Sequence, residues 1–419
     1  MLFAGGGSGG HVFPALAVAE ELAGRGWTVV FAGAAGGMEE GLVAGRGWPF
    51  AALPARPLVG RNPVAQARAL VTVGRSTLAA RRLIRRRGVD AVVGTGGYVS
   101  APAVLGARLA GRPALLVEPN AEPGVANRWL SRWAAGAAVA YAETGARLHC
   151  PSWVTGVPVR REFFAVGNHA EGGGGPRLLV LGGSQGARQL NRDLPAALAR
   201  IAGGLPGLSV LHQAGRGQEE ATRGAYAAAG LAVTAPGDTP APDSAGMPGA
   251  PSAVSIEVAG FIDGVAEAMA EADLVASRAG AITAAELCAA GRAALLVPLA
   301  LAGGHQSGNA LLLAEAGAAV MVSANAGAER LAAALGDLLG DPGRLAAMGR
   351  AARSLARAGA AAAIADRVEA LAGRRTGGAP GGGAGAGAEG DGVDAGAAGA
   401  GAPGGGTGPD WAAGEEARS

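Results

Sequence analysis

Residues 1–22 read MLFAGGGSGGHVFPALAVAEEL. The first four residues are apolar, residues 5–10 hold five glycines and one serine, and the segment from Pro14 to Leu22 has the spacing of a helix. A loop without side-chain bulk that leads into a helix start presents backbone N–H groups to an anion. We therefore expect a strand over residues 1–4, a helix over residues 14–22 and an anion site in the loop between them.

Strand-like and helix-like segments alternate beyond this loop. Glycines at 24 and 26 end the first helix, and the apolar segment WTVVF at 27–31 predicts the next strand. Similar pairs occupy residues 89–134, and a second glycine loop lies in PRLLVLGGSQGARQLNRDLPAAL at 176–198, with Ser184 in the place of Ser8. Such alternation predicts an α/β fold with two Rossmann-like domains, each built on a parallel sheet.

Composition sets the limits of these domains and excludes several classes of protein. The chain has 419 residues, a net charge of +2, two distant cysteines and 4% aromatic residues. We predict domains over residues 1–156 and 157–356, a surface insertion at 235–253 and a disordered Gly/Ala tail at 373–419. We also expect free buried thiols, a cytoplasmic chain without a spanning helix and no nucleic-acid partner.

The spacing of Gly5, Gly7 and Gly10 also fits a dinucleotide-binding fingerprint. An NAD site needs an acidic residue after the second strand, and this chain has Ala32, Gly33, Ala34 and Ala35 there. A nicotinamide-dependent oxidoreductase and a purely structural tight turn therefore remain alternatives to a site for another anionic ligand.

Polar residues at the loops are candidates for chemistry. His11 joins the first loop to its helix and is a candidate base near neutral pH. Thr283 and Glu286 fit a capping box, and the same segment could instead bind a diphosphate and a ribose. Gln306 suits neighbouring sugar hydroxyls, whereas Asn309 could be an ordinary helix residue.

A basic helix is predicted over residues 64–88, where seven arginines alternate with apolar residues. It is either a solvated face on a packed helix or a surface for anionic lipid headgroups. Its arginines are Arg68, Arg75, Arg81, Arg82, Arg85, Arg86 and Arg87.

Taken together, GGGSGGHVFPALAVAEEL, GTGGYVSAP, LGGSQGA and SRAGAITAAE resemble the glycine loops and donor-binding helix of the MurG family over residues 2–372. These bacterial N-acetylglucosaminyltransferases convert lipid I to lipid II in peptidoglycan synthesis. The resemblance implies a GT-B fold, a C-terminal helix at about 357–372 that crosses back to the first domain, UDP-N-acetylglucosamine (UDP-GlcNAc) as donor, lipid I as acceptor and a peripheral place on the inner leaflet.

The resemblance also implies roles for individual residues. Arg160 and Ser184 would contact the diphosphate, Ile262 the uracil, Glu286 the ribose and Gln306 the sugar hydroxyls. The full donor set is Ser8, Gly9, Gly10, Asn120, Arg160, Ser184, Ile262, Ala281, Ile282, Thr283, Ala284, Ala285, Glu286 and Gln306. The loops for the acceptor diphosphate would contain Gly7, Gly96, Gly97 and Tyr98.

The chain departs from the family pattern at three places. Ser8 stands where the family usually has threonine, Pro119 where it has glutamine, and Val157 where it has asparagine. The glycines of the loops are unchanged.

The chemistry that these residues could perform is an inverting transfer. No Asp-x-Asp pair is present, so we expect metal-independent chemistry without a cofactor, with His11 as base and Glu118 as the alternative base. Another acceptor for a GT-B enzyme, and a sensor that binds the donor without transfer, also remain open.

Overall fold

The structure is a computed structural model that describes residues 1–54, 63–167, 175–183, 186–234, 254–299 and 305–373. The predicted insertion at 235–253, the tail beyond Gly373 and Ser184 lie outside these residues. Within the described residues the chain forms thirteen strands and fourteen α-helices. The predicted domain boundaries remain a prediction.

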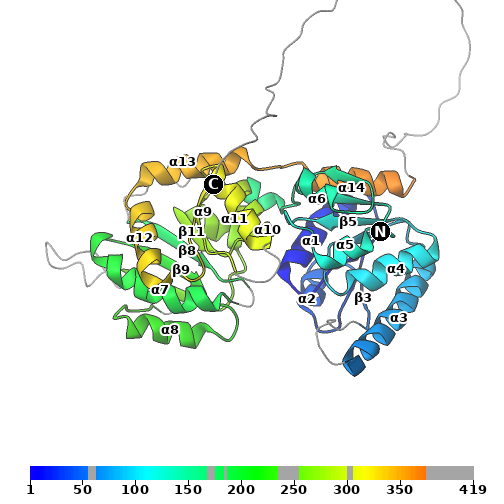
Figure 1. Ribbon diagram of the computed structural model, residues 1–419, viewed down its shortest axis with the longest axis horizontal. Coiled ribbons are helices and arrows are strands. Elements are labelled where there is room, and N and C mark those ends of the chain that lie inside the picture. The colour runs from blue at the N-terminus through cyan, green and yellow to red at the C-terminus, as the bar shows by residue number, and fades with distance from the viewer. Residues whose placement is uncertain (55–62, 168–174, 184–185, 235–253, 300–304, 374–419) are drawn as a thin grey trace, which may run out of the picture. The chain divides into compact units, whose positions relative to one another are not determined.

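Thirteen strands form two parallel sheets (Figure 1). The first sheet has the order β3-β2-β1-β4-β5-β6-β7 and the second the order β10-β9-β8-β11-β12-β13. We call the first sheet and its helices the N-terminal lobe and the second sheet and its helices the C-terminal lobe. The strands are β1 (Leu2–Ala4), β2 (Val30–Gly33), β3 (Phe50–Ala52), β4 (Val92–Gly94), β5 (Ala114–Glu118), β6 (Gly136–Val139), β7 (Ser152–Val154), β8 (Arg177–Leu181), β9 (Ser209–Gln213), β10 (Ser255–Ala259), β11 (Leu274–Ser277), β12 (Ala293–Leu296) and β13 (Ala319–Met321).

Helices follow the strands and cover both faces of each sheet. Leu2 and Ala4 pack into one buried cluster and Phe3 into the other, as alternating side chains of a doubly covered strand must. The helices are α1 (Gly9–Gly24), α2 (Met38–Ala44), α3 (Pro63–Arg86), α4 (Ser100–Ala110), α5 (Val125–Leu130), α6 (Ala142–Ala146), α7 (Arg188–Ile201), α8 (Glu219–Ala228), α9 (Val265–Glu271), α10 (Ala281–Ala290), α11 (His305–Glu315), α12 (Gly327–Leu339), α13 (Pro342–Ser354) and α14 (Ala360–Leu371), with short 3₁₀ turns η1 (Arg161–Phe164) and η2 (Ala202–Gly204).

The order of strands places a ligand crevice in each lobe. In each sheet the first strand lies between the second and the fourth strand along the chain. The direction in which successive strands are added to the sheet therefore reverses between β1 and β4 and between β8 and β11. Ligands of open parallel sheets bind beyond the carboxyl ends of the strands at such a reversal. Both predicted glycine loops begin there, after Ala4 and after Leu181.

Helix α1 begins earlier than the sequence predicts. Its first residue is Gly9, so Pro14 lies inside the helix and His11 in its first turn. The expectation that Pro14 starts the helix is therefore wrong. Because a proline has no N–H, the Gly10 carbonyl has no donor four residues along the helix.

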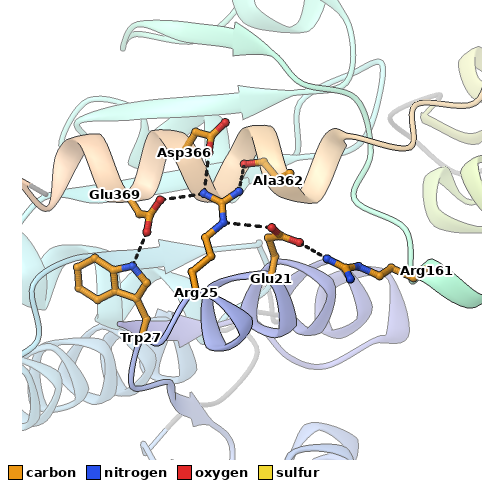
Figure 2. A network of polar contacts seen from close by, with 7 residues as sticks. All are labelled: Glu21, Arg25, Trp27, Arg161, Ala362, Asp366 and Glu369. Atoms are coloured by element: carbon orange, nitrogen blue, oxygen red, sulfur yellow. Dashed lines mark hydrogen bonds and ion pairs between the residues drawn. The ribbon is translucent and has the colours of Figure 1, made fainter. Parts of the chain in front are cut away.

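The C-terminal helix α14 packs on α1 in the N-terminal lobe. Its Ile364, Ala365 and Val368 are buried in the same cluster as Phe3. Figure 2 shows the Arg25 guanidinium between the two helices, 2.6 Å from Asp366 and 2.8 Å from Glu369. These contacts fix the last described helix against the helix that carries His11.

Both cysteines are unpaired, as predicted, but only one is buried. Cys288 is buried in α10, whereas Cys150 is partly exposed. Of the described helices, none is both long enough and apolar enough to span a lipid bilayer.

Candidate active site

His11 is tied to the loop that follows β4. Its Nδ1 lies 2.9 Å from the Thr95 carbonyl oxygen, and the Thr95 hydroxyl donates to the His11 carbonyl at 2.6 Å. A carbonyl oxygen only accepts, so Nδ1 carries the proton and Nε2 keeps a lone pair. The ring is thus held in the tautomer that a general base needs.

The electrostatic surroundings keep His11 neutral at physiological pH. Burial lowers the pKa of His11 below its ordinary value of 6.5, while the hydrogen bond to Thr95 and the charge of Glu118 oppose this shift. A neutral imidazole with a free Nε2 can accept a proton at pH 7.

The glycines of both loops are required by close packing around His11. Gly96 has φ +101°, and a Cβ added there would lie 2.7 Å from His11 Nδ1. Gly7 has φ +86°, and its Cβ would lie 2.9 Å from the Tyr98 ring. The structure therefore packs Gly96 against His11 and Gly7 against Tyr98, and the role of these residues in binding the acceptor diphosphate stays a prediction.

A buried carboxylate below the first loop was not predicted from the sequence. Glu39, in α2, is 1% exposed and accepts hydrogen bonds from the N–H of Ala34 at 3.0 Å and of Gly7 at 3.5 Å. The Gly7 amide thus points to a carboxylate of the protein itself. An acidic residue in the first turn of the helix after Gly36 and Gly37 was the one available signal.

Amides for an outside anion remain at the start of α1. Gly9 and Gly10 are in the first turn, where backbone N–H groups have no acceptor within the helix. Ser8 is the N-cap residue, and its side chain makes no capping hydrogen bond. The predicted contribution of these three residues to the donor site stays a prediction.

The buried carboxylate of Glu118 accepts hydrogen bonds from the loop that follows β5. Glu118 is 2% exposed; Oε1 accepts from the backbone N–H and Nδ2 of Asn120 at 3.1 and 2.8 Å, and Oε2 from Gly124 N–H and Asn127 Nδ2 at 2.8 and 3.0 Å. With four donors on one carboxylate, no lone pair faces a substrate. This geometry favours His11 over Glu118 as the base and gives Glu118 the task of orienting Asn120.

In the C-terminal lobe, the capping box that was one of two alternatives for Thr283 and Glu286 is wrong. Helix α10 begins at Ala281, its N-cap is Gly280, and no side chain caps it. Thr283 is therefore the third helical residue, and the amides of residues 281–283 have no acceptor within the helix. The physical reason is that the glycine before α10 places the helix start three residues earlier, where the N–H groups stay open to a ligand.

Glu286 points to Arg160. Its Oε1 lies 3.3 Å from Arg160 Nη2, and its side chain is 10% exposed. Burial raises the pKa of Glu286 to about 7, and the nearby Arg160 charge opposes this rise. The structure thus brings together the two residues predicted for the diphosphate and the ribose.

The other predicted donor residues lie on neighbouring elements. Ile262 follows β10 and packs against the buried cluster that contains residues of α10. Gln306, the second residue of α11, accepts from the Leu299 N–H at 2.9 Å. Asn309 is fully buried and donates to the Ala279 carbonyl at 3.1 Å, so it supports the loop before α10.

No group of three or more His, Cys, Asp or Glu side chains is placed to hold a metal ion within the described ranges. Arg160, which contacts Glu162 and Glu286, is the predicted diphosphate ligand that the structure places beside α10.

Comparison with known proteins identifies the two lobes. Residues 1–139 match the glycosyltransferase family 28 N-terminal domain, and residues 177–367 match the glycosyltransferase family 28 C-terminal domain. The chain is 42% identical over 376 residues to a protein of Halorhodospira halophila, covering 88% of this chain and 97% of the relative. It is 41% identical to a protein of Stutzerimonas stutzeri, covering 87% and 97%. Both are named UDP-N-acetylglucosamine–N-acetylmuramyl-(pentapeptide) pyrophosphoryl-undecaprenol N-acetylglucosamine transferase.

Solved structures agree with this assignment. MurG of Acinetobacter baumannii is 32% identical, with a TM-score of 0.66 and coverage of 88% of this chain and 99% of that one. The calicheamicin glycosyltransferase CalG4, at 18% identity, a TM-score of 0.57 and coverage of 89% and 98%, shares the fold. The chain belongs to glycosyltransferase family 28 and has the GT-B fold of its MurG members.

Proposed function

We propose that this protein transfers N-acetylglucosamine from UDP-GlcNAc to the C4 hydroxyl of the MurNAc residue of lipid I, with inversion, and so makes lipid II. The observation that carries the proposal is the bond of His11 Nδ1 to the Thr95 carbonyl, which leaves Nε2 unprotonated beside the open helix start at Gly9. The naming of relatives at 41–42% identity as this transferase supports the same acceptor.

The donor would bind to the C-terminal lobe. Arg160 and the first-turn amides of α10 would hold the diphosphate, and Glu286 would accept hydrogen bonds from the ribose hydroxyls. Ile262 would contact the uracil, and Gln306 the sugar hydroxyls. Ser184, outside the described residues, would complete the diphosphate site.

The acceptor would bind between the glycine loops of the N-terminal lobe, where Gly96, Gly97 and Tyr98 are the proposed contacts to its diphosphate. Gly7, whose amide donates to Glu39, would shape the loop rather than contact the diphosphate. His11 Nε2 takes the proton of the O4 hydroxyl as O4 forms its bond to C1 of the sugar. The bond from C1 to the UDP oxygen breaks, and its electron pair leaves with UDP. Arg160 and the amides stabilise the charge that develops on the leaving diphosphate.

A UDP-release assay with a lipid I analogue tests the proposal directly. We expect UDP release and a product heavier by one N-acetylglucosamine with the unmodified protein, and a strong loss with Glu286→Ala. Release of UDP with an unrelated alcohol but not with the lipid I analogue would point to another acceptor. Binding of UDP-GlcNAc without any turnover would indicate a sensor.

Donor binding is expected to depend on pH through Glu286. Its raised pKa, about 7, means that the carboxylate is mostly protonated at pH 6 and mostly ionised at pH 8. The ionised form accepts the ribose hydroxyls better, so the Kd of UDP-GlcNAc should fall about five- to tenfold between pH 6 and pH 8. Calorimetric titration measures the Kd at each pH. Glu286→Gln is the matched control, and its Kd for UDP-GlcNAc should not change with pH. A pH-independent Kd in the unmodified protein would contradict the assignment.

We further propose that the protein lies peripherally on the cytoplasmic face of the cell membrane and contacts anionic lipids through α3. Val71 and Leu78 are 63% and 46% exposed, and exposed Arg75, Arg82 and Arg85 alternate with them. Their spacing of three and four residues places all five on one side of the helix. An apolar stripe between arginines fits the boundary between headgroups and acyl chains. The side chain of Arg68 lies outside the described residues.

Charge reversal on this helix face should release the protein from vesicles. We expect the triple variant Arg75→Glu, Arg82→Glu, Arg85→Glu to bind phosphatidylglycerol vesicles roughly a hundredfold more weakly, since each arginine contributes about 1 kcal/mol near an anionic surface. Co-sedimentation measures the binding. The control is Arg344→Glu, Arg350→Glu on exposed positions of α13. Equal loss in both variants would show a nonspecific effect of charge and contradict a role for α3.

A further inference from the structure

Arg160 lies between two aromatic rings that come from different lobes. Its guanidinium carbon is 4.8 Å from the ring centre of Phe13 in α1 and 4.8 Å from that of Phe163 in η1. Phe163 is fully buried in the C-terminal lobe, so one of the two rings belongs to a fixed core residue. The other ring, Phe13, is only partly buried and lies two residues after His11.

The edges of the guanidinium are only partly used. Nη1 lies 2.7 Å from Glu162 and Nη2 lies 3.3 Å from Glu286, while the buried Nε has no hydrogen-bond partner. A buried N–H without an acceptor is costly and rare in folded proteins. An anionic ligand oxygen at this edge would satisfy it, provided that the two rings keep the guanidinium plane in position.

The Phe13 ring is itself closely held. A Cβ added at Gly9 would lie 3.0 Å from Phe13 Cε2, so the ring packs over the first residue of α1. The neighbouring Arg161 reaches the same helix, with its Nη2 2.6 Å from Glu21 (Figure 2). The helix start that carries His11 and the arginine proposed for the diphosphate are thus joined through one aromatic ring.

We infer that Phe13 is a positioning residue for the donor diphosphate, which acts across the lobes by holding the plane of Arg160. This inference rests on the proposed function. It adds a residue of the N-terminal lobe that affects the affinity for the donor. A cation–π contact that is shielded from water stabilises the position of the cation, and an aliphatic side chain of similar size does not. Removing the ring should weaken diphosphate binding while nucleoside binding stays unchanged.

The test compares UDP with uridine by calorimetry at pH 8. We expect Phe13→Leu to weaken UDP binding about fivefold to tenfold and to leave uridine binding within twofold of the unmodified protein. Phe13→Tyr, which keeps an aromatic face, should restore UDP binding. Trp153→Leu removes the ring under another arginine, Arg367 at 4.9 Å, and should change neither affinity.

A double-mutant cycle separates action through Arg160 from a general packing effect. In an Arg160→Ala background, Phe13→Leu should cause no further loss of UDP affinity. Equal UDP affinity of Phe13→Leu and the unmodified protein, or an additive loss in the cycle, would overturn the inference and leave the proposed function intact. Absence of UDP binding to the unmodified protein would instead overturn both. Thermal unfolding checks that each variant is folded, and Phe13→Met replaces Phe13→Leu if that variant is not.

Discussion

Replacing His11 by asparagine is expected to lower kcat about a thousandfold, the loss typical of a missing general base. An asparagine amide can still donate a hydrogen bond to the Thr95 carbonyl, the partner of His11 Nδ1, but offers no basic nitrogen in the place of Nε2. The variant therefore keeps the hydrogen bond to Thr95 and removes the nitrogen that would accept the proton. Steady-state UDP release with a lipid I analogue measures the effect.

The pH profile provides a second readout of the same residue. Because the pKa of His11 lies below 6.5, kcat of the unmodified protein at saturating UDP-GlcNAc, where the pH dependence of donor binding through Glu286 does not contribute, should be constant near neutral pH and fall as the pH drops through that pKa. The acid limb should vanish in His11→Asn. Near-normal turnover with an unchanged profile in this variant would assign the base to another residue.

Replacing Glu118 by glutamine is the second change with a large expected effect. The carboxylate accepts four hydrogen bonds in a buried site, and a glutamine amide would turn an N–H₂ group toward two of those donors. We expect a loss of about 3 kcal/mol in the free energy of unfolding, measured in urea. Activity should fall as well, because the loop that carries Asn120 loses its anchor.

The pH profile of this variant distinguishes a scaffold from a base. The negative charge of Glu118 raises the pKa of His11, so Glu118→Gln should shift the acid limb to lower pH without removing it. The matched control is Glu122→Gln in the same loop, an exposed partner of Arg147 whose loss should cost less than about 1 kcal/mol. Disappearance of the acid limb in Glu118→Gln would make Glu118 the base after all.

The sequence predicted much of the fold for a clear physical reason. Buried parallel strands are continuous apolar segments, and glycines separate them from helices, so the segments around Leu2–Ala4 and Arg177–Leu181 were recognisable. The start of α1 was placed too late because proline is typical of the first turn of a helix, which pointed to Pro14. Here Gly9 and Gly10 are inside the first turn, where their amides stay accessible.

The site was only partly predictable because much of it is built from contacts between distant segments. The sequence identified His11 and Glu286 as candidates because each lies close to a glycine motif. The tautomer of His11 depends on Thr95, 84 positions away, and the plane of Arg160 depends on Phe13. Glu118 was predicted only as an alternative base and Glu39 was not singled out, and only the fold shows both carboxylates buried and bonded to backbone N–H groups. Such long-range pairs leave no pattern in a single sequence.

A crystal structure with bound UDP-GlcNAc is the most direct test of the proposed donor site. We expect uracil beside Ile262, ribose hydroxyls on Glu286, and the diphosphate between Arg160 and the amides that begin α10, with the sugar facing His11. A nucleotide bound instead along the first glycine loop, over Gly5–Gly7, would contradict the proposed donor site.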